Sequence, residues 1–164
     1  MAALLASGLW GDMLITMLVL DLRHRQELLD HARRESPREC CGILIGGRSQ
    51  SQSRATVSQV LPCANASASP ENRYLISAVD LLAAQKRARQ RESAVLGFYH
   101  SHPHSAAFPS VEDLRGAYWA GHSYMIIGPL DGKAEIRSFL LCQEEGPRRA
   151  PFRFHFEEEP VLTL

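Results

Sequence analysis

The sequence predicts one domain of the α/β (α+β) class, in which a central mixed β-sheet is flanked by helices. Two observations support this class. Short runs of branched and aromatic residues alternate with helical segments, and no internal repeat or low-complexity segment interrupts the pattern. With 164 residues, the chain is long enough to bury a substantial core. We assign residues 13–164 to this domain and residues 1–12 to an N-terminal extension.

The extension is apolar, but its pattern is not that of a signal peptide or a membrane span. It lacks a basic region and a convincing cleavage site, and Gly11 and Asp12 interrupt it well short of a spanning length. We therefore expect residues 1–12 to be disordered or loosely docked, with no association with a membrane. Met13 and Met17 are alternative candidates for the first residue.

The first half of the domain is predicted to contain three strands and one helix. They are a strand over 14–21, a helix over 22–35, a strand ending at the paired glycines 46–47, and a strand over 54–63. Pro37 ends the helix. The apolar side of this helix comprises Leu22, Leu28, Leu29 and Ala32. Its two histidines, His24 and His31, are expected in solvated or half-buried positions.

The second half follows the same alternation. Its predicted elements are a short strand over 73–76, a helix over 77–92, a strand over 94–99, a helix over 110–120, and strands over 123–127, 134–142 and 152–156. Ser77 is the expected N-cap of the longer helix, and its apolar stripe is expected to be Val79, Leu82 and Ala83. His122 and His155 lie in or beside the last strands, and the sequence gives no reason to assign them as ligands.

Charge and cysteine content exclude some classes of function. The chain has 18 basic and 18 acidic residues and no net charge, so no basic surface for nucleic acid is expected. The four cysteines show neither a CxxC motif nor a regular framework, which favours a reduced, cytoplasmic protein with buried thiols. The oligomeric state stays open, with a homodimer as one candidate.

The segment from residue 97 to 114 concentrates the side chains that can carry chemistry. An apolar strand leads into His100 and His102, which leave its end on the same side. At roughly 3.3 Å per residue, the two imidazoles lie about 6.6 Å apart along one face and can turn toward one ion. Neutral imidazole is a common nitrogen ligand of zinc.

A third protein ligand would come from His104 or from a carboxylate farther along the chain. Pro103 interrupts the alternation that would bring His104 to the same face. Ser110 fits the N-cap of the next helix, and Asp113 fits the capping-box position in its first turn. Two histidines and Asp113 would leave a fourth position for water, as at a catalytic zinc site. A plain turn followed by a helix would favour the same serine and aspartate.

Two further residues complete the candidate site. Glu39 stands directly before a hydrophobic strand and is either a surface loop residue or a carboxylate held in a cleft. Ser101 is expected to face away from the metal, because successive side chains of a strand alternate between its faces.

Three motifs in this order resemble the JAMM (MPN+, JAB-type) zinc metalloproteases. They are Pro-x-Glu-x-Cys-Gly-x-Leu-x-Gly from Pro37 to Gly46, His-Ser-His-Pro from His100 to Pro103, and Ser-x-x-Asp from Ser110 to Asp113. The similarity extends from about residue 14 to the C-terminus, and the compact length resembles the prokaryotic branch. The resemblance implies the curved, cytidine-deaminase-like sheet of this family.

The resemblance also implies a site and an activity. One zinc ion per chain would be held by His100, His102 and Asp113, with Glu39 as the general base and Ser110 as an oxyanion donor or only a helix cap. Similar prokaryotic members act on ubiquitin-like sulfur-carrier proteins that end in Gly-Gly. The expected function is therefore a zinc-dependent isopeptidase or peptidase that cuts the amide bond after this diglycine. The alternatives are a non-catalytic MPN-type interaction scaffold and a general small-peptide metallopeptidase.

Overall fold

A computed structural model describes residues 17–49, 51, 53–145 and 152–164, so the predicted extension over 1–12 lies outside the described residues. The elements in chain order are β1 (Met17–Leu20), α1 (Leu22–Glu35), β2 (Cys41–Ser49), β3 (Arg54–Cys63), α2 (Ala78–Gln90), β4 (Ala94–Ser101), α3 (Val111–Gly116), β5 (Ser123–Gly128), β6 (Glu135–Glu145), β7 (Phe152–Glu159) and β8 (Val161–Thr163). No helix of this described part is both long and apolar enough to cross a membrane.

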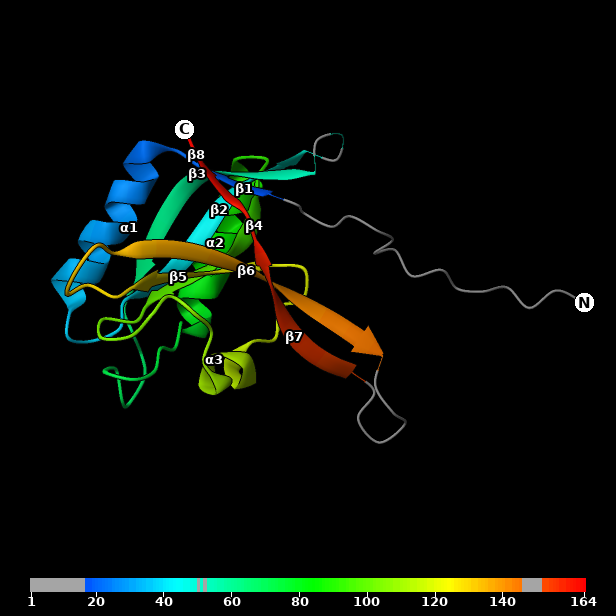
Figure 1. Cartoon of the computed structure of the whole chain (residues 1–164). Helices are drawn as coiled ribbons and strands as arrows, with labels where there is room; N and C mark the ends of the chain where they lie inside the picture. Colours follow the sequence, from blue (N-terminus) through cyan, green and yellow to red (C-terminus); the bar gives the residue numbers. More distant parts are fainter. Residues whose placement is uncertain (1–16, 50, 52, 146–151) are drawn as a thin grey trace, which may run out of the picture.

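Eight strands form one mixed sheet in the order β7-β6-β5-β4-β2-β3-β1-β8. β1 runs parallel to β3 and to β8, β4 runs parallel to β5, and the remaining neighbours are antiparallel. The sheet curls, and β6 and β7 run together away from the body of the molecule (Figure 1). The predicted class, a curved mixed sheet flanked by helices, is confirmed.

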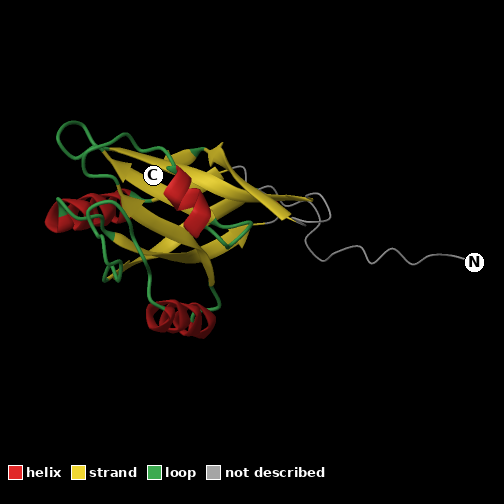
Figure 2. Ribbon diagram, turned by 90° about the horizontal axis from the view of Figure 1, so that it is seen from below, coloured by secondary structure: helices red, strands yellow, loops and turns green. Residues whose placement is uncertain are grey.

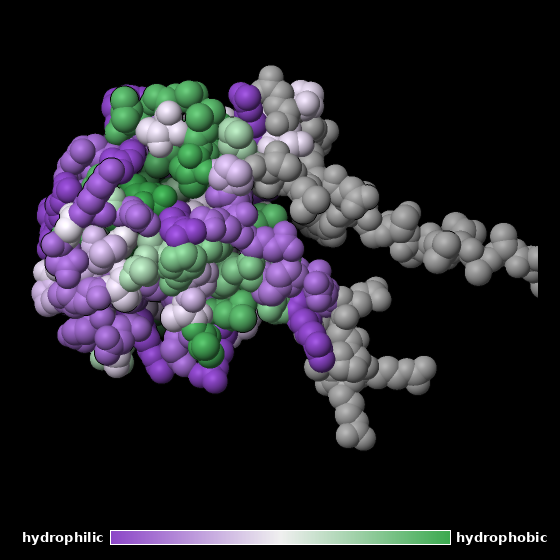
Figure 3. Space-filling model, viewed as in Figure 1, coloured by the Kyte–Doolittle hydropathy of each residue, from purple (hydrophilic) through white to green (hydrophobic). Residues whose placement is uncertain are grey.

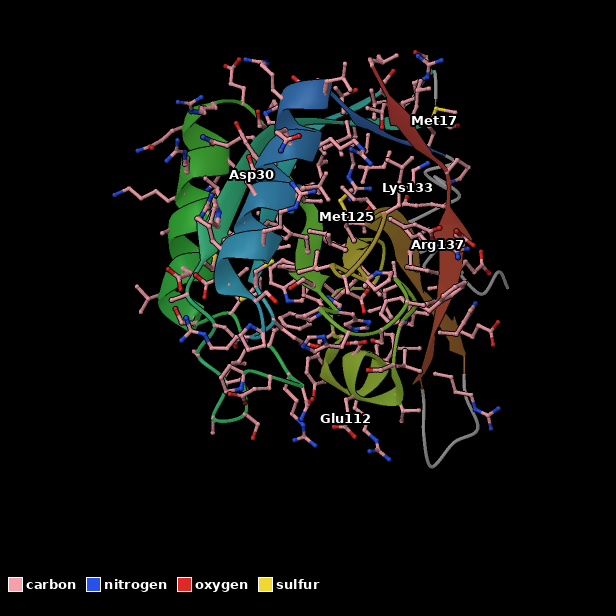
Figure 4. All side chains as sticks on the ribbon, turned by 60° about the vertical axis from the view of Figure 1, so that its left-hand side comes forward. Met17, Asp30, Glu112, Met125, Lys133 and Arg137 are labelled. Atoms are coloured by element: carbon pink, nitrogen blue, oxygen red, sulfur yellow. The ribbon has the colours of Figure 1, made fainter. Side chains whose placement is uncertain are left out.

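Helix α1 covers one face of the sheet. Asp21 caps it by accepting the backbone N–H of His24, and its buried side includes Leu28, Leu29 and Ala32. These residues pack into a core that contains Met125, which Figure 4 shows inside the fold. Leu22 was expected on the same side but is 66% exposed, because it begins the helix beyond the edge of this core.

Helix α2 covers a second core, which contains Ile43, Ile45 and Phe98 (Figure 2 shows helices on different sides of the strands). The predicted N-cap is confirmed, since the side chain of Ser77 accepts the N–H of Asp80. The predicted stripe is wrong. Val79 and Leu82 are 76% and 63% exposed, and Ala83 is exposed as well. The buried residues are instead Ala84 and Ala88, whose small side chains let the helix approach the sheet closely.

Two further expectations need correction. Residues 73–76 are irregular and form no strand, and the helix predicted to reach residue 120 ends at Gly116. It ends early because Ala117 turns into the core as extended backbone, whereas Gly121 adopts a positive φ of 73° in a later turn. Strand β8 was not predicted, and the strand expected over 14–21 is described only over Met17–Leu20.

Candidate metal centre

The two histidines of the site leave the end of β4 as the sequence predicts. β4 lies between β2 and β5, with His100 opposite Cys41 on one side and Ile126 on the other. One residue past the strand, the backbone N–H of His102 donates to the carbonyl of Ile127 at 2.8 Å. His100 and His102 are 1% and 7% exposed. A central strand therefore fixes the backbone from which both imidazoles project.

Asp113 joins them from helix α3. The capping box predicted for this helix is present: Ser110 Oγ accepts the N–H of Asp113 at 3.1 Å, and Asp113 Oδ2 accepts the N–H of Ser110 at 2.6 Å. These two bonds set the orientation of the Asp113 carboxylate. The side chain is buried, which is unusual for an acid and calls for a partner.

Potential ligand atoms of three residues converge between β4 and α3. His100 Nε2 and His102 Nε2 lie 3.0 Å apart, and they lie 3.1 and 3.3 Å from Asp113 Oδ1 and Oδ2 respectively. Two ligands of a tetrahedral zinc ion, bound at about 2.0–2.1 Å, are separated by about 3.3 Å. The separations and the donor types of these residues therefore fit a zinc ion.

Contacts on the outer side of the two imidazoles favour the orientation in which their Nε2 atoms face the cluster. His102 Nδ1 lies 3.2 Å from the carbonyl oxygen of Ala106, which can accept a proton carried on Nδ1; this would free the lone pair of Nε2 for an ion, in place of the hydrogen bond that Nε2 makes to Asp113 without one. The ring of Tyr74 stacks on His100 with centroids 4.3 Å apart and an interplanar angle of 18°. These contacts hold both rings before any ion binds.

Glu39 faces this cluster from the loop before β2. Its Oε1 atom lies 4.0 Å from His102 Nε2, and its Oε2 atom is buried with no hydrogen-bond partner among the residues that the structure describes. Its backbone is fixed on both sides, because Asn65 Nδ2 donates to its carbonyl and its own N–H donates to Pro70. The side chain is 6% exposed. Of the two readings open from the sequence, the carboxylate in a cleft is therefore the one found.

Burial and hydrogen bonding set the proton affinities of the site. Burial raises the pKa of Glu39 to about 7, with the charge of His102 opposing and that of Asp113 reinforcing the rise. Burial also disfavours ionised Asp113, but the hydrogen bonds with both imidazoles outweigh it and hold its pKa well below its usual range. Burial lowers the pKa of His100, which keeps its imidazole neutral, as a ligand must be.

Other candidates from the sequence fall at defined places. Ser101 points away from the cluster and its Oγ accepts the N–H of Cys40 at 2.9 Å, as the alternation predicts. His104 is exposed and stands outside the converging group. Ser110 is exposed beside Asp113 and serves as the helix cap.

Sequence reasoning missed three contributors to this centre: Tyr74, Asn65 and the carbonyl of Ala106. Each acts through a contact that depends on tertiary structure, and an asparagine or a tyrosine near a loop carries no distinctive spacing. Tyr74 was hidden further by the incorrect strand over residues 73–76.

A pocket of about 480 Å³ opens beside Asp113. Its walls are largely aromatic and aliphatic and include Tyr74, Phe98, Trp119, Tyr124, Leu75 and Leu81. At its rim, Glu112 forms ion pairs with two arginines: its Oε2 atom lies 3.1 Å from Arg73 Nη2, and its Oε1 atom lies 2.6 Å from Arg115 Nη1. Glu112 points outward from α3 (Figure 4). An apolar pocket with a charged rim next to a candidate ligand is the arrangement of a binding site.

The curled mixed sheet thus presents two histidines and an aspartate, a group that could hold a metal ion, beside a buried glutamate. The family model described as prokaryotic homologs of the JAB domain matches residues 21–142, and the chain belongs to this family. The predicted resemblance is thereby confirmed.

Curated relatives carry related names. The chain is 34% identical over 113 residues to a desampylase from Haloferax volcanii, covering 66% of this chain and 78% of the relative. It is 36% identical over 116 residues to a probable TtuB-protein conjugate cleaving protease from Thermus thermophilus, covering 71% and 70%. It is 27% identical over 115 residues to the CysO-cysteine peptidase of Mycobacterium tuberculosis, covering 70% and 75%.

Solved structures agree with the fold. A solution structure of a Desulfitobacterium hafniense protein superposes with a TM-score of 0.75 at 33% identity, covering 90% of this chain and 93% of that one. A solution structure of a Salinibacter ruber protein gives a TM-score of 0.59 at 29% identity, covering 88% and 91%.

Proposed function

We propose that this protein is a zinc-dependent isopeptidase or peptidase that hydrolyses the amide bond after the C-terminal Gly-Gly of a ubiquitin-like or sulfur-carrier protein. The observation that carries the proposal is the convergence of His100, His102 and Asp113 within 3.3 Å of one another, with Glu39 4.0 Å from His102. This arrangement would supply three ligands for one zinc ion and a separate base, which supports the proposal.

Zinc bound there would supply a Lewis acid for the substrate carbonyl and would lower the pKa of a bound water toward about 7. Glu39 is the proton carrier of the chain. With a pKa near 7, its carboxylate accepts a proton from the attacking water and then delivers it to the departing amine. The Oε2 atom of Glu39 supports this role, because it has an acceptor position that no group of the described part of the chain fills.

Ser110 is proposed to stabilise the oxyanion. Its Oγ atom accepts the N–H of Asp113, which leaves the hydroxyl proton free to be donated to the substrate. Its position at the start of α3 places this donor beside the ligand set, and the exposed side chain is open to a substrate. A comparable donor contributes roughly 2.7–4 kcal/mol to catalysis.

The proposed substrate follows from the relatives and from the shape of the site. The relatives are named for cleaving a TtuB-protein conjugate and CysO-cysteine, so we infer a protein carrier with a group attached to its end. The three candidate ligands and Glu39 are all less than a tenth exposed, so only a slender chain can reach them. Glycine has no side chain and permits such close approach. The neighbouring pocket would then hold a larger residue of the same tail.

The test uses a sulfur carrier extended by one residue, such as cysteine, after its diglycine. Incubation with the zinc-loaded protein should shorten the carrier by that one residue, as measured by mass spectrometry. A lysine-linked protein on the same diglycine should also be released.

Two results would support the alternatives. An intact carrier together with cleavage of unrelated peptides would indicate a general peptidase. Zinc binding without any cleavage of either substrate would indicate an interaction scaffold.

A further inference from the structure

We propose that Cys142, His155 and Glu157 form a second metal site, selective for a zinc-like transition metal, on the β6–β7 pair. No sequence motif marked His155 as a ligand. The strand register now supplies one.

The register of β6 and β7 brings the three residues together. Cys142 lies directly opposite His155 in the antiparallel ladder, and Glu157 lies two residues farther along β7. Side chains two residues apart in a strand project from the same face, so Glu157 shares the face of His155 and Cys142. One potential ligand atom of each residue lies within 4.8 Å of the others.

The site differs in both place and chemistry from the candidate centre of His100, His102 and Asp113, called the His100 centre below. His100 pairs with Ile126 and Ile126 pairs with Arg137, whereas Cys142 lies five residues farther along β6. At about 3.4 Å per residue, this is a shift of roughly 17 Å along the strand. The second cluster also contains sulfur, which the first does not. Thiolate and imidazole together favour zinc and its first-row neighbours over magnesium or calcium.

The imidazole of His155 already lies between two carboxylates. Its Nε2 atom is 3.1 Å from Glu157 Oε1, close to the separation expected for two ligands of one zinc ion. Its Nδ1 atom is 3.8 Å from Glu144 Oε1 on the other strand. At 3.8 Å this carboxylate is beyond hydrogen-bond distance, so Glu144 adds negative charge beside the imidazole and is not counted among the ligands.

The cluster is open to solvent and carries excess negative charge. His155 and Cys142 are half-buried, and Glu144 and Glu157 are exposed. Figure 3 shows hydrophilic residues on the projecting part of these strands. When the metal–sulfur bond forms, the thiol proton of Cys142 is released to solvent. Burial and the nearby acids raise the pKa of this thiol, so we expect weaker binding than at the His100 centre.

The test is a cobalt titration of the full chain after chelation of bound metal, in the presence of a phosphine reductant. Thiolate coordination produces a sulfur-to-cobalt charge-transfer absorption in the near ultraviolet, which the sulfur-free His100 centre cannot produce. We expect this band to saturate when one cobalt ion is bound at the Cys142 site of each chain, and to persist in Asp113→Asn. It should disappear in Cys142→Ser and require at least tenfold more cobalt in His155→Gln.

Cys63→Ser is the matched control, because Cys63 is also a half-buried free thiol but belongs to β3. It should keep the band. Absence of the band in the wild-type chain, or its persistence in Cys142→Ser, would overturn the proposal. Because the readout is thiolate absorption and not peptide cleavage, this result is independent of the outcome for the proposed function.

Discussion

Replacing Glu39 by glutamine tests the central assignment of the site. The amide keeps the shape of the side chain and its backbone contacts to Asn65 and Pro70, so the fold and zinc content should be unchanged. It cannot accept a proton. General-base catalysis contributes about 100-fold to 10,000-fold, so kcat should fall by that factor while KM changes little. At about 1.36 kcal/mol per tenfold, the barrier rises by roughly 2.7–5.4 kcal/mol.

The assay combines zinc analysis with carrier cleavage across pH. In the wild type, kcat/KM should rise with pH as Glu39 deprotonates, with an inflection at or below about 7, because burial raises this pKa and a bound cation would lower it again. The pH profile of Glu39→Gln should lack this rise in kcat/KM. Glu35→Gln, which alters a half-exposed acid paired with Arg38, is the control and should keep full activity. Glu39→Gln with normal zinc content and a kcat within threefold of wild type would refute the general-base role.

Three other changes have expected outcomes. In elemental analysis, Asp113→Ala should lose the more tightly bound zinc, that of the His100, His102 and Asp113 group, while His104→Ala keeps it; the opposite pattern would show that the wrong third ligand was chosen. Gly128→Ala should weaken zinc binding at least tenfold, because a Cβ there would meet the carbonyl oxygen of His102 at 2.5 Å; unchanged affinity would exclude this coupling. Burial raises the pKa of Glu159, so the stability from this carboxyl is present below its unfolded pKa and is lost as pH rises through the folded pKa. Glu159→Gln should therefore raise Tm at pH 8, by about 2–4 °C for each kcal/mol gained in the free energy of unfolding, and change it little at pH 4. An equal change in Tm at both pH values would contradict this linkage.

The elements with a strong local signal were predicted closely. Helix α1 spans residues 22–35 and strand β3 spans residues 54–63, the ranges expected from their patterns. The elements that depend on distant partners were not. β8 has three residues and pairs in parallel with β1 at the other end of the chain, so no local sequence pattern predicts it. The exposed Val79 and Leu82 show that apolar spacing alone does not decide which face of α2 meets the sheet.

The site could be predicted from sequence to the extent that its geometry is local. His100 and His102 are two residues apart on one strand, and the Ser110–Asp113 capping box is closed within a single turn. The position of Glu39 depends instead on the pairing of β2 with β4, which brings residues some sixty positions apart into one cleft. Before the structure, only the family resemblance indicated that Glu39 lies beside the two histidines.

The sequence left open whether Asp113 is only a capping residue or also a candidate metal ligand. The same carboxylate accepts the N–H of Ser110 and meets both imidazoles, so its capping bond does not remove it from the candidate ligand group. Helix α3 has only six residues and begins at this cap. A helix this short is not stable by itself. Its first turn and the candidate ligand set therefore depend on the same side chain, and folding of α3 onto β4 assembles both together.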